Sequence, residues 1–360
     1  MATMSARFVR WGLAALALGG AAVPALAGPV VGLDGLRDWN LIVLGDLTSS
    51  SEVEGRTFVG GNLNGNSSNY QISTPPPATT TLPGLTVVGD VNGGTKNLNN
   101  GSGAIVGGSV NSGFNLNGAP QTVQVGGTIS NTNVNSNTVQ SGLASSGTFL
   151  SDLQQQKSLL SSSLTDLSNN LAGLSSNSQV TISGNRATFN ATPDSNGVAV
   201  FNLTADQLNS FGEVQFNLNG ADTAIVNVSG TNINLNDNFL GGTNGLGEHV
   251  IWNFNQAQSL DLSTAWGGSI LAPNAAATTS NYVQGSAVFG SLVQNGEFHL
   301  GTYSGNYSYT PGGSSGGSSG GNPAPVPEAP TMLLFLVGAP MAIGAAHWRR
   351  RRALAGKSKA

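Results

Sequence analysis

A five-residue motif recurs in the first part of the chain: valine, two glycines, a polar residue and an aliphatic residue. It is VGGNL at residues 59–63, VGGSV at 106–110 and VGGTI at 125–129, with a shortened copy, VGDV, at 88–91. The first valines of successive copies are 29, 18 and 19 residues apart. Short β-branched runs separated by glycine about every 20 residues are typical of stacked repeats, in which each repeat buries its apolar face against the next.

A second pair of related segments extends this pattern toward the C-terminus. It consists of GSIL at 268–271 and GSLV at 290–293, 22 residues apart. Glycine and asparagine suit the corners of such a stack because they adopt positive φ at low cost. We therefore predict a mainly β fold of the solenoid type. A β-sandwich is the alternative, although its strands would recur about every 8–12 residues.

The charge distribution excludes one class of partner. Charged residues make up only 8% of the chain, against about 25% in ordinary soluble proteins. Between Gly28 and Val326 there are 5 basic and 16 acidic residues, a net charge of −11. Nucleic acid is therefore not expected as a partner, because phosphate binding needs clustered lysine and arginine. The absence of cysteine (Cys 0) excludes disulfides and thiolate chemistry.

One segment has helical rather than strand periodicity. Its apolar residues are spaced by 3, 4 and 7 along one stripe, over about residues 149–174. Thr148 or Ser146 is expected to cap its start, and Gly173 to loosen its end. We predict one long helix lying alongside the β body. The stripe consists of Phe149, Leu150, Leu153, Leu160, Leu164, Leu167, Leu171 and Leu174.

The N-terminus has the pattern of a secretory signal peptide over residues 1–27. Arg7 and Arg10 precede a short apolar run, and Ala25 and Ala27 are the small residues before a cleavage that leaves Gly28 first. The apolar run is too short to span a bilayer of about 30 Å. Export is the expected outcome.

The C-terminus consists of three successive parts. A linker rich in Gly, Ser and Pro (311–325) precedes the five residues Val326, Pro327, Glu328, Ala329 and Pro330. An apolar run at 331–348 follows, and then Arg349, Arg350, Arg351 and Arg352. Eighteen apolar residues are just long enough to span a membrane, and the arginines would remain on the cytoplasmic side. Membrane contact is expected through this helix alone.

This three-part order resembles the PEP-CTERM sorting signal of Gram-negative bacteria, over residues 326–360. The resemblance implies that a membrane enzyme, exosortase, cuts near the motif and discards the helix, after signal peptidase has acted at the other end. Members of this group occur in species that make exopolysaccharide. The chain departs from the pattern because Ala329 stands where a second proline is usual and Pro330 follows it. This difference leaves the cleavage position open.

The body between the signals, residues 28–310, resembles the choice-of-anchor A family. The opening matches are WNLIVLGDL at 39–47 and VEGR at 53–56. The later ones are HVIWNF at 249–254, WGGSILAPNA at 266–275 and GEFH at 296–299. The resemblance implies an ice-binding-like adhesin, with a right-handed parallel β-helix and a long helix packed alongside. It implies surface attachment and identifies no ligand.

Residues suited to catalysis or metal binding are sparse. His249 follows Glu248, and His299 lies two residues after Glu297, but the two histidines are 50 residues apart and lack metal-ligand spacing. Surface or strand-edge positions are the simpler interpretation. The oxygen-rich run at 232–238 is the nearest to a calcium loop, and solenoid corners explain it equally well. We predict no catalytic residue, no metal site and no cofactor.

Two further groups bear on carbohydrate. Asp46, Glu52 and Glu54 are close in sequence, and Glu54 is expected to pair with Arg56, so a polysaccharide-acting enzyme is the alternative function. Flat faces of Asn, Thr and Ser could instead hydrogen-bond sugars. Aromatic rings would then supply a stacking surface, namely Tyr303, Tyr307 and Tyr309.

These patterns together favour an exported, non-catalytic adhesin or matrix protein associated with exopolysaccharide or biofilm. It would be located at the cell surface or in the extracellular matrix of a Gram-negative bacterium, held transiently in the inner membrane by the C-terminal helix. A structural surface-layer protein is the third interpretation.

Overall fold

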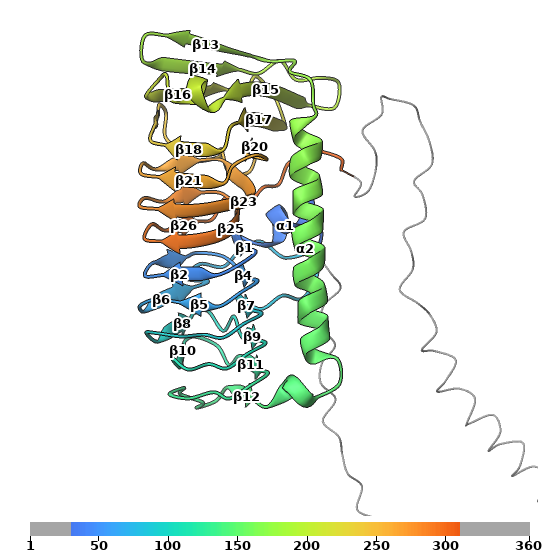
Figure 1. Cartoon of the computed structure of the whole chain (residues 1–360), viewed down its shortest axis with the longest axis vertical. Helices are drawn as coiled ribbons and strands as arrows, with labels where there is room; N and C mark the ends of the chain where they lie inside the picture. Colours follow the sequence, from blue (N-terminus) through green and yellow to red (C-terminus); the bar gives the residue numbers. More distant parts are fainter. Residues whose placement is uncertain (1–29, 310–360) are drawn as a thin grey trace, which may run out of the picture. The chain divides into compact units, whose positions relative to one another are not determined.

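The computed structural model describes residues 30–309, which form a mainly β body with one long helix along its side (Figure 1). Within this part of the chain neighbouring strands are parallel, apart from one antiparallel pair, β13 (Gln179–Ser183) and β14 (Arg186–Asn190). The extensive parallel pairing confirms the predicted mainly β class and does not fit the β-sandwich alternative, whose sheets are antiparallel. No helix in this range is long and apolar enough to cross a membrane.

The largest sheet contains a long row of parallel strands facing the helix. In spatial order it consists of β12 (Thr138–Gln140), β11 (Thr122–Val125), β9 (Ala104–Val106), β7 (Leu85–Val87), β4 (Thr57–Val59), β1 (Leu41–Val43), β25 (Ala287–Gln294), β23 (Ser269–Thr279), β20 (Val250–Asn253), β17 (Thr223–Ser229) and β15 (Val198–Thr204).

Two further rows complete the stack, and a small sheet lies at one end. A side branch of the largest sheet contains β18 (Asn232–Leu235), β21 (Ser259–Leu262), β2 (Leu47–Ser49) and β5 (Leu63–Asn64), joined through β23 and β25. The seven-stranded sheet contains β10 (Phe114–Leu116), β8 (Lys96–Leu98), β6 (Ser68–Tyr70), β3 (Glu52–Val53), β26 (Phe298–His299), β24 (Val283–Gln284) and β22 (Trp266–Gly267). The four-stranded end sheet adds β16 (Glu213–Asn217) and β19 (Asn238–Phe239) to β13 and β14.

The order of the strands differs from the order of the chain in one respect. The first strand, β1, lies in the middle of the long row, between β4 and β25, with Leu41 opposite both Thr57 and Ala287. The chain therefore starts at mid-height, builds down to β12, crosses to the far end and returns to meet its own beginning (Figure 1). The crossing is made by a single helix.

That helix is α2 (Phe149–Ala172), preceded by the short η1 (Leu143–Ser145), and its position confirms the periodicity argument. Six of the eight predicted stripe residues are buried, whereas Leu150 is 37% exposed and Leu174 is partly buried. Thr148 occupies the N-cap position but does not accept a backbone N–H; its hydroxyl donates to Asp152 at 2.6 Å. The capping prediction is therefore right in position and wrong in mechanism.

Three asparagines on adjacent strands of the long row hold the end of α2. A helix rises about 4.5 Å over three residues, close to the spacing of about 4.8 Å between strands, so carbonyls three residues apart match successive strands. The side-chain amides satisfy carbonyls near the helix C-terminus, which lack partners within the helix. The bonds run from Asn202 Nδ2 to the Leu174 carbonyl (3.1 Å), from Asn227 Nδ2 to that of Leu171 (2.8 Å) and from Asn253 Nδ2 to that of Ser168 (2.8 Å).

The corners explain why the motif contains a second glycine. The N–H groups of Gly61, Gly89 and Gly108 each bond to the carbonyl of the corresponding glycine one strand earlier, at 2.8–3.0 Å. Beside this column runs a line of side-chain oxygens. Asp90 Oδ1, for example, accepts the Ser109 N–H at 2.6 Å and lies 2.1 Å from where a Cβ on Gly108 would be. Any side chain there would collide with the acceptor.

The strand register corrects the shortened copy of the motif. Val59 lies opposite Val87, and Leu63 bridges to Val91. The copy therefore has full length, over 87–91, and Val88 occupies the place of the first glycine, where it packs beneath α2. The steps along the column are then 28, 19 and 19 residues, more regular at its end than the sequence alone indicated.

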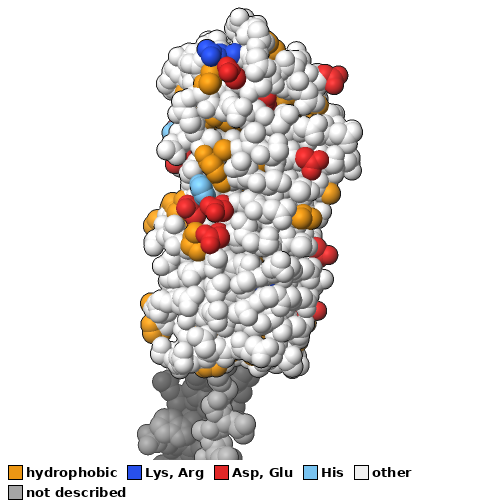
Figure 2. Space-filling view, turned by 90° about the vertical axis from the view of Figure 1, so that its left-hand side faces the viewer, with side chains coloured by type: hydrophobic (Ala, Val, Ile, Leu, Met, Phe, Trp, Pro, Cys, Tyr) orange, Lys and Arg blue, Asp and Glu red, His pale blue; other side chains and the backbone are white. Residues whose placement is uncertain are grey.

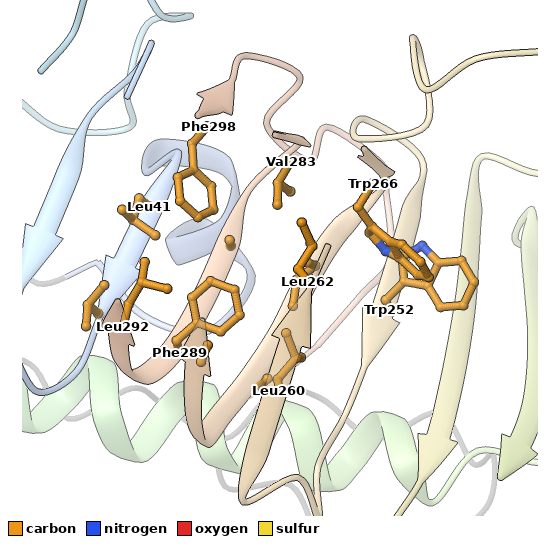
Figure 3. Close-up of a cluster of buried hydrophobic side chains, with 14 of the residues drawn as sticks. Leu41, Trp252, Leu260, Leu262, Trp266, Val283, Phe289, Leu292 and Phe298 are labelled. Carbon is orange, nitrogen blue, oxygen red and sulfur yellow. The ribbon is translucent and has the colours of Figure 1, made fainter. Parts of the chain in front are cut away.

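Residues of the long row alternate between two apolar layers. Ile251 belongs to the layer under α2, together with α1 (Leu33–Asp38), whereas Trp252 belongs to the layer enclosed by the strand rows. Figure 3 shows side chains from different rows pointing toward one another in the enclosed layer. Trp252 is fully buried and its ring centroid lies 4.9 Å from that of Trp266. The core is continuous along the stack.

Candidate binding surface

The outer face of the seven-stranded sheet is built by strand alternation. Val53, Tyr70 and Phe298 are fully buried, so the residues on either side of each point outward. Toward the α2 N-terminal end of the stack this face carries asparagines, and toward its middle it carries acids and a histidine. Figure 2 shows most of the viewed side as neither charged nor hydrophobic, with acidic side chains beside a histidine.

The asparagines form hydrogen-bonded columns, which we call the amide ladders. Each side-chain amide donates to the side-chain oxygen of the corresponding residue on the neighbouring strand, which fixes both side chains and leaves one N–H and one lone pair free. In the seven-stranded sheet the bonds join Asn115 to Asn97 (2.8 Å) and Asn117 to Asn99 (3.2 Å). Around the corner they join Asn92 to Asn64 (3.1 Å) and Asn111 to Asn92 (2.8 Å).

The ladders present a repeating neutral pattern. Their rungs follow the strand spacing of about 4.8 Å, so donors and acceptors recur at that interval on a fixed backbone. No charged residue occurs between Lys96 and Asp152 in the sequence. Lys96 itself is fully buried and donates to the Asn66 carbonyl at 2.5 Å. A ligand on this surface would therefore meet amides, hydroxyls and glycine backbone.

A more polar band adjoins the ladders on the same sheet. His299 lies 2.8 Å from a Glu297 oxygen and its ring stacks on Tyr282, with centroids 4.6 Å apart. Glu52 accepts a hydrogen bond from Asn69 at 2.9 Å, which joins the band to the asparagines. Among residues 30–309 there is no group of three or more His, Cys, Asp or Glu residues arranged to hold a metal ion.

The remaining predicted acid and histidine residues make structural contacts. His249 bonds through Nδ1 to the Asp222 carbonyl at 2.8 Å, far from His299 in its partners. The expected Glu54–Arg56 pair is wrong, because Glu54 accepts the Leu300 N–H (2.6 Å) and Arg56 donates to the Pro76 carbonyl (2.9 Å). Both side chains are used by loops that are distant in sequence.

The carboxylates and the oxygen-rich run likewise serve the fold. Asp46 Oδ1 accepts the Asn62 N–H at 2.7 Å at a corner, so it is not brought together with Glu52 by any contact. Within 232–238, Asn232 accepts from Ser259 (2.9 Å). Asp237 is fully buried, and neither carboxyl oxygen has a partner among the described residues. Burial raises the pKa of Asp237 to about 7.

The tyrosines do not form the expected stacking surface. Tyr303 is 1% exposed, and its hydroxyl lies 2.7 Å from Thr223 Oγ1. The Tyr307 hydroxyl donates to Asn170 of α2 at 3.1 Å. Burial raises the pKa of both phenols. These rings attach the last described segment to the body beneath α2, a tertiary role that the tyrosine spacing in the sequence did not indicate.

The processing residues lie outside the described part of the chain. They are Ala25, Ala27 and Gly28 of the signal cleavage, Val326 to Pro330 of the sorting motif, the apolar run at 331–348, and Arg349 to Arg352. Their predictions therefore stand as sequence predictions.

A rigid parallel-sheet scaffold that presents flat, neutral columns of side chains defines a class of surface-binding rather than pocket-forming proteins. Over residues 32–300 the chain matches the family described as "Putative Ice-binding-like adhesive domain". Because the match covers most of the chain, the protein belongs to this family of adhesive domains. No curated protein and no solved structure matches it.

Proposed function

We propose that the protein is an exported, non-catalytic adhesin whose amide ladders bind a neutral polysaccharide of the extracellular matrix. The observation that carries this proposal is the ladder geometry: amides fixed by their neighbours, repeating at strand spacing and free of charge. Sugar hydroxyls donate and accept in equal measure, as the free half of each amide does. Membership of an adhesive-domain family supports a binding role.

In the same proposal, the three strand rows wind as one right-handed parallel β-helix. Successive strands β4, β5 and β6 enter three different rows, and β7, Val91 and β8 enter the same rows again, one strand further along. Parallel crossovers of this kind are right-handed in almost all proteins. A continuous coil would hold the ladders in register over their whole length.

Binding is tested with the double substitution Asn97→Ala and Asn115→Ala. It removes two rungs, each contributing about 0.5–1.5 kcal/mol, so we expect affinity for neutral matrix polysaccharide to fall about tenfold. The readout is retention on immobilised polysaccharide, with circular dichroism to verify folding. Asn169→Ala, an exposed asparagine on α2, is the matched control and should bind like the parent.

Unchanged retention of the double variant would contradict the role of the ladders. Release of reducing sugar ends by the parent protein would instead indicate an enzyme.

Export and sorting are tested by mapping terminal peptides. We expect the matrix fraction to contain a form that begins near Gly28 and ends near Pro327, released by digestion of the matrix glycan. Mass spectrometry of membrane, matrix and medium fractions provides the measurement. Recovery of the protein in the membrane alone, with Arg349–Arg352 intact, would mean that a plain tail anchor operates in place of the sorting signal.

A further inference from the structure

The end sheet terminates in a strand with an open edge. β13 (Gln179–Ser183) is the last strand of the four-stranded sheet, at the extremity of the stack, and pairs only with β14. Among residues 30–309, no hydrogen bond reaches β13 from any other segment. An open edge presents unpaired N–H and C=O groups to any incoming strand.

Other strands at the ends of the stack are protected by side chains that act in place of a further strand. On β15, Asn177 accepts the Val200 N–H at 2.7 Å and donates to the Val198 carbonyl at 2.9 Å. On β10, Thr132 Oγ1 accepts the Phe114 N–H and Asn133 Oδ1 the Leu116 N–H, both at 3.0 Å. β12 is only three residues long. β13 has five residues and no such cap.

The composition of β13 also differs from that of a guarded edge. Its sequence, QVTIS, contains no charge, no proline and three β-branched residues, whereas natural edges are usually blunted by lysine or proline. Ile182 is 43% exposed. It lies opposite Ala187, and Val180 lies opposite Phe189; both partners are fully buried. The core-facing side of β13 therefore continues the apolar layer beyond its last cover.

We propose that β13 pairs with β13 of a second copy of this chain, antiparallel and about a two-fold axis through Thr181. In that register Ile182 of each copy lies opposite Val180 of the other, on the same face, so both half-exposed isoleucines are covered. Directly opposite residues form the strongest side-chain contacts between antiparallel strands. A two-fold interface of this type closes on itself and ends at a dimer.

The surroundings are compatible with two copies meeting here despite their acidic bodies. The charged pair on the neighbouring strands, Arg186 and Glu213, is joined at 3.1 Å, so the two charges offset each other. The self-complementary register favours a second copy over an unrelated strand, because a five-residue strand centred on Thr181 matches itself residue for residue.

The chain contains no cysteine, which permits a test with single thiols. In Thr181→Cys the two thiols would lie on directly opposed residues, with Cα atoms about 4.5–5.5 Å apart. This separation suits a disulfide, whose Cα distance is about 4.4–6.8 Å. We expect the full-length variant to become a disulfide-linked dimer under mild oxidation, seen as a doubled mass on a non-reducing gel.

Gln179→Cys is the register control on the same strand. Its two thiols would be about 14 Å apart, since they are offset by four residues of about 3.4 Å, and should not join. Thr48→Cys, exposed on β2, controls for random collision. Equal cross-linking of all three variants, or none in Thr181→Cys, would overturn the proposal. Independently, Ile182→Lys should halve the mass measured by light scattering while leaving the circular dichroism unchanged.

Discussion

Replacing Trp252 by alanine is expected to lower the free energy of unfolding by about 3–5 kcal/mol, the usual cost of removing a large buried aromatic side chain. Trp252 is fully buried at the centre of the aromatic group in the enclosed core. The indole N–H also donates to the Gly267 carbonyl at 2.9 Å, which would lose its partner. Its ring centroid lies 4.9–6.4 Å from those of Phe189, Phe216, Phe239 and Trp266.

Urea unfolding followed by far-UV circular dichroism measures this effect without depending on tryptophan fluorescence. Leu150→Ala on α2 is the control, because that side chain is 37% exposed and its removal should change stability by no more than about 0.5 kcal/mol. A loss below about 1 kcal/mol in the Trp252 variant would mean that the aromatic cluster does not stabilise the stack as the packing indicates.

Stability is expected to fall as the pH rises from about 4 to about 7, and Asp237 is the cause. Burial raises its pKa from 3.8 to about 7, so the native state retains a proton that the unfolded state has lost. Where the native state binds more protons, stability decreases with pH. The difference of about three pKa units corresponds to a loss on the order of 4 kcal/mol above pH 7.

Lys96 should reverse the trend at higher pH. Burial lowers its pKa to about 8, so between about pH 8 and 10.5 the unfolded state binds more protons than the native state. Stability therefore rises again over that interval. The two buried groups together predict a minimum near pH 7–8, in contrast to the maximum that most proteins show between about pH 5 and 8.

The test compares thermal unfolding at pH 5 and pH 8 for the parent and for Asp237→Asn. The parent should have the lower melting temperature at pH 8, and the variant should have lost that difference. Asp261→Asn, on an exposed strand position, controls for the change in net charge. A pH dependence that persists in Asp237→Asn would assign the effect to another group.

Features set by local chemistry could be predicted from the sequence. The leucine spacing located α2 to within two residues, because helical period is a local property. The glycine motif predicted stacked strands because its corners tolerate no side chain, as Gly108 beside Asp90 demonstrates. The position of Val88 was misassigned, since valine at a glycine site is legible only from the strand register.

Features set by distant contacts could not be predicted. Tyr303 carries the same side chain whether it faces solvent or Thr223, and only the path of the chain decides which. Glu54 and Arg56 are neighbours in sequence, yet both find backbone partners in remote loops. The amide ladders were foreseen only as polar faces, because the pairing of Asn97 with Asn115 depends on strands aligning at a step of 18 residues.

The central position of β1 has a consequence for the order in which the protein assembles. Leu41 and its partner Ala287 are separated by most of the chain, so the seam between them closes only when the C-terminal strands have emerged from the translocation channel. Until then the early strands can stack on one another while one side of β1 stays open. Such long-range pairings are slow because the loop must be closed before the contact forms. The seam between β1 and β25 is therefore the last and slowest part of the molecule to form.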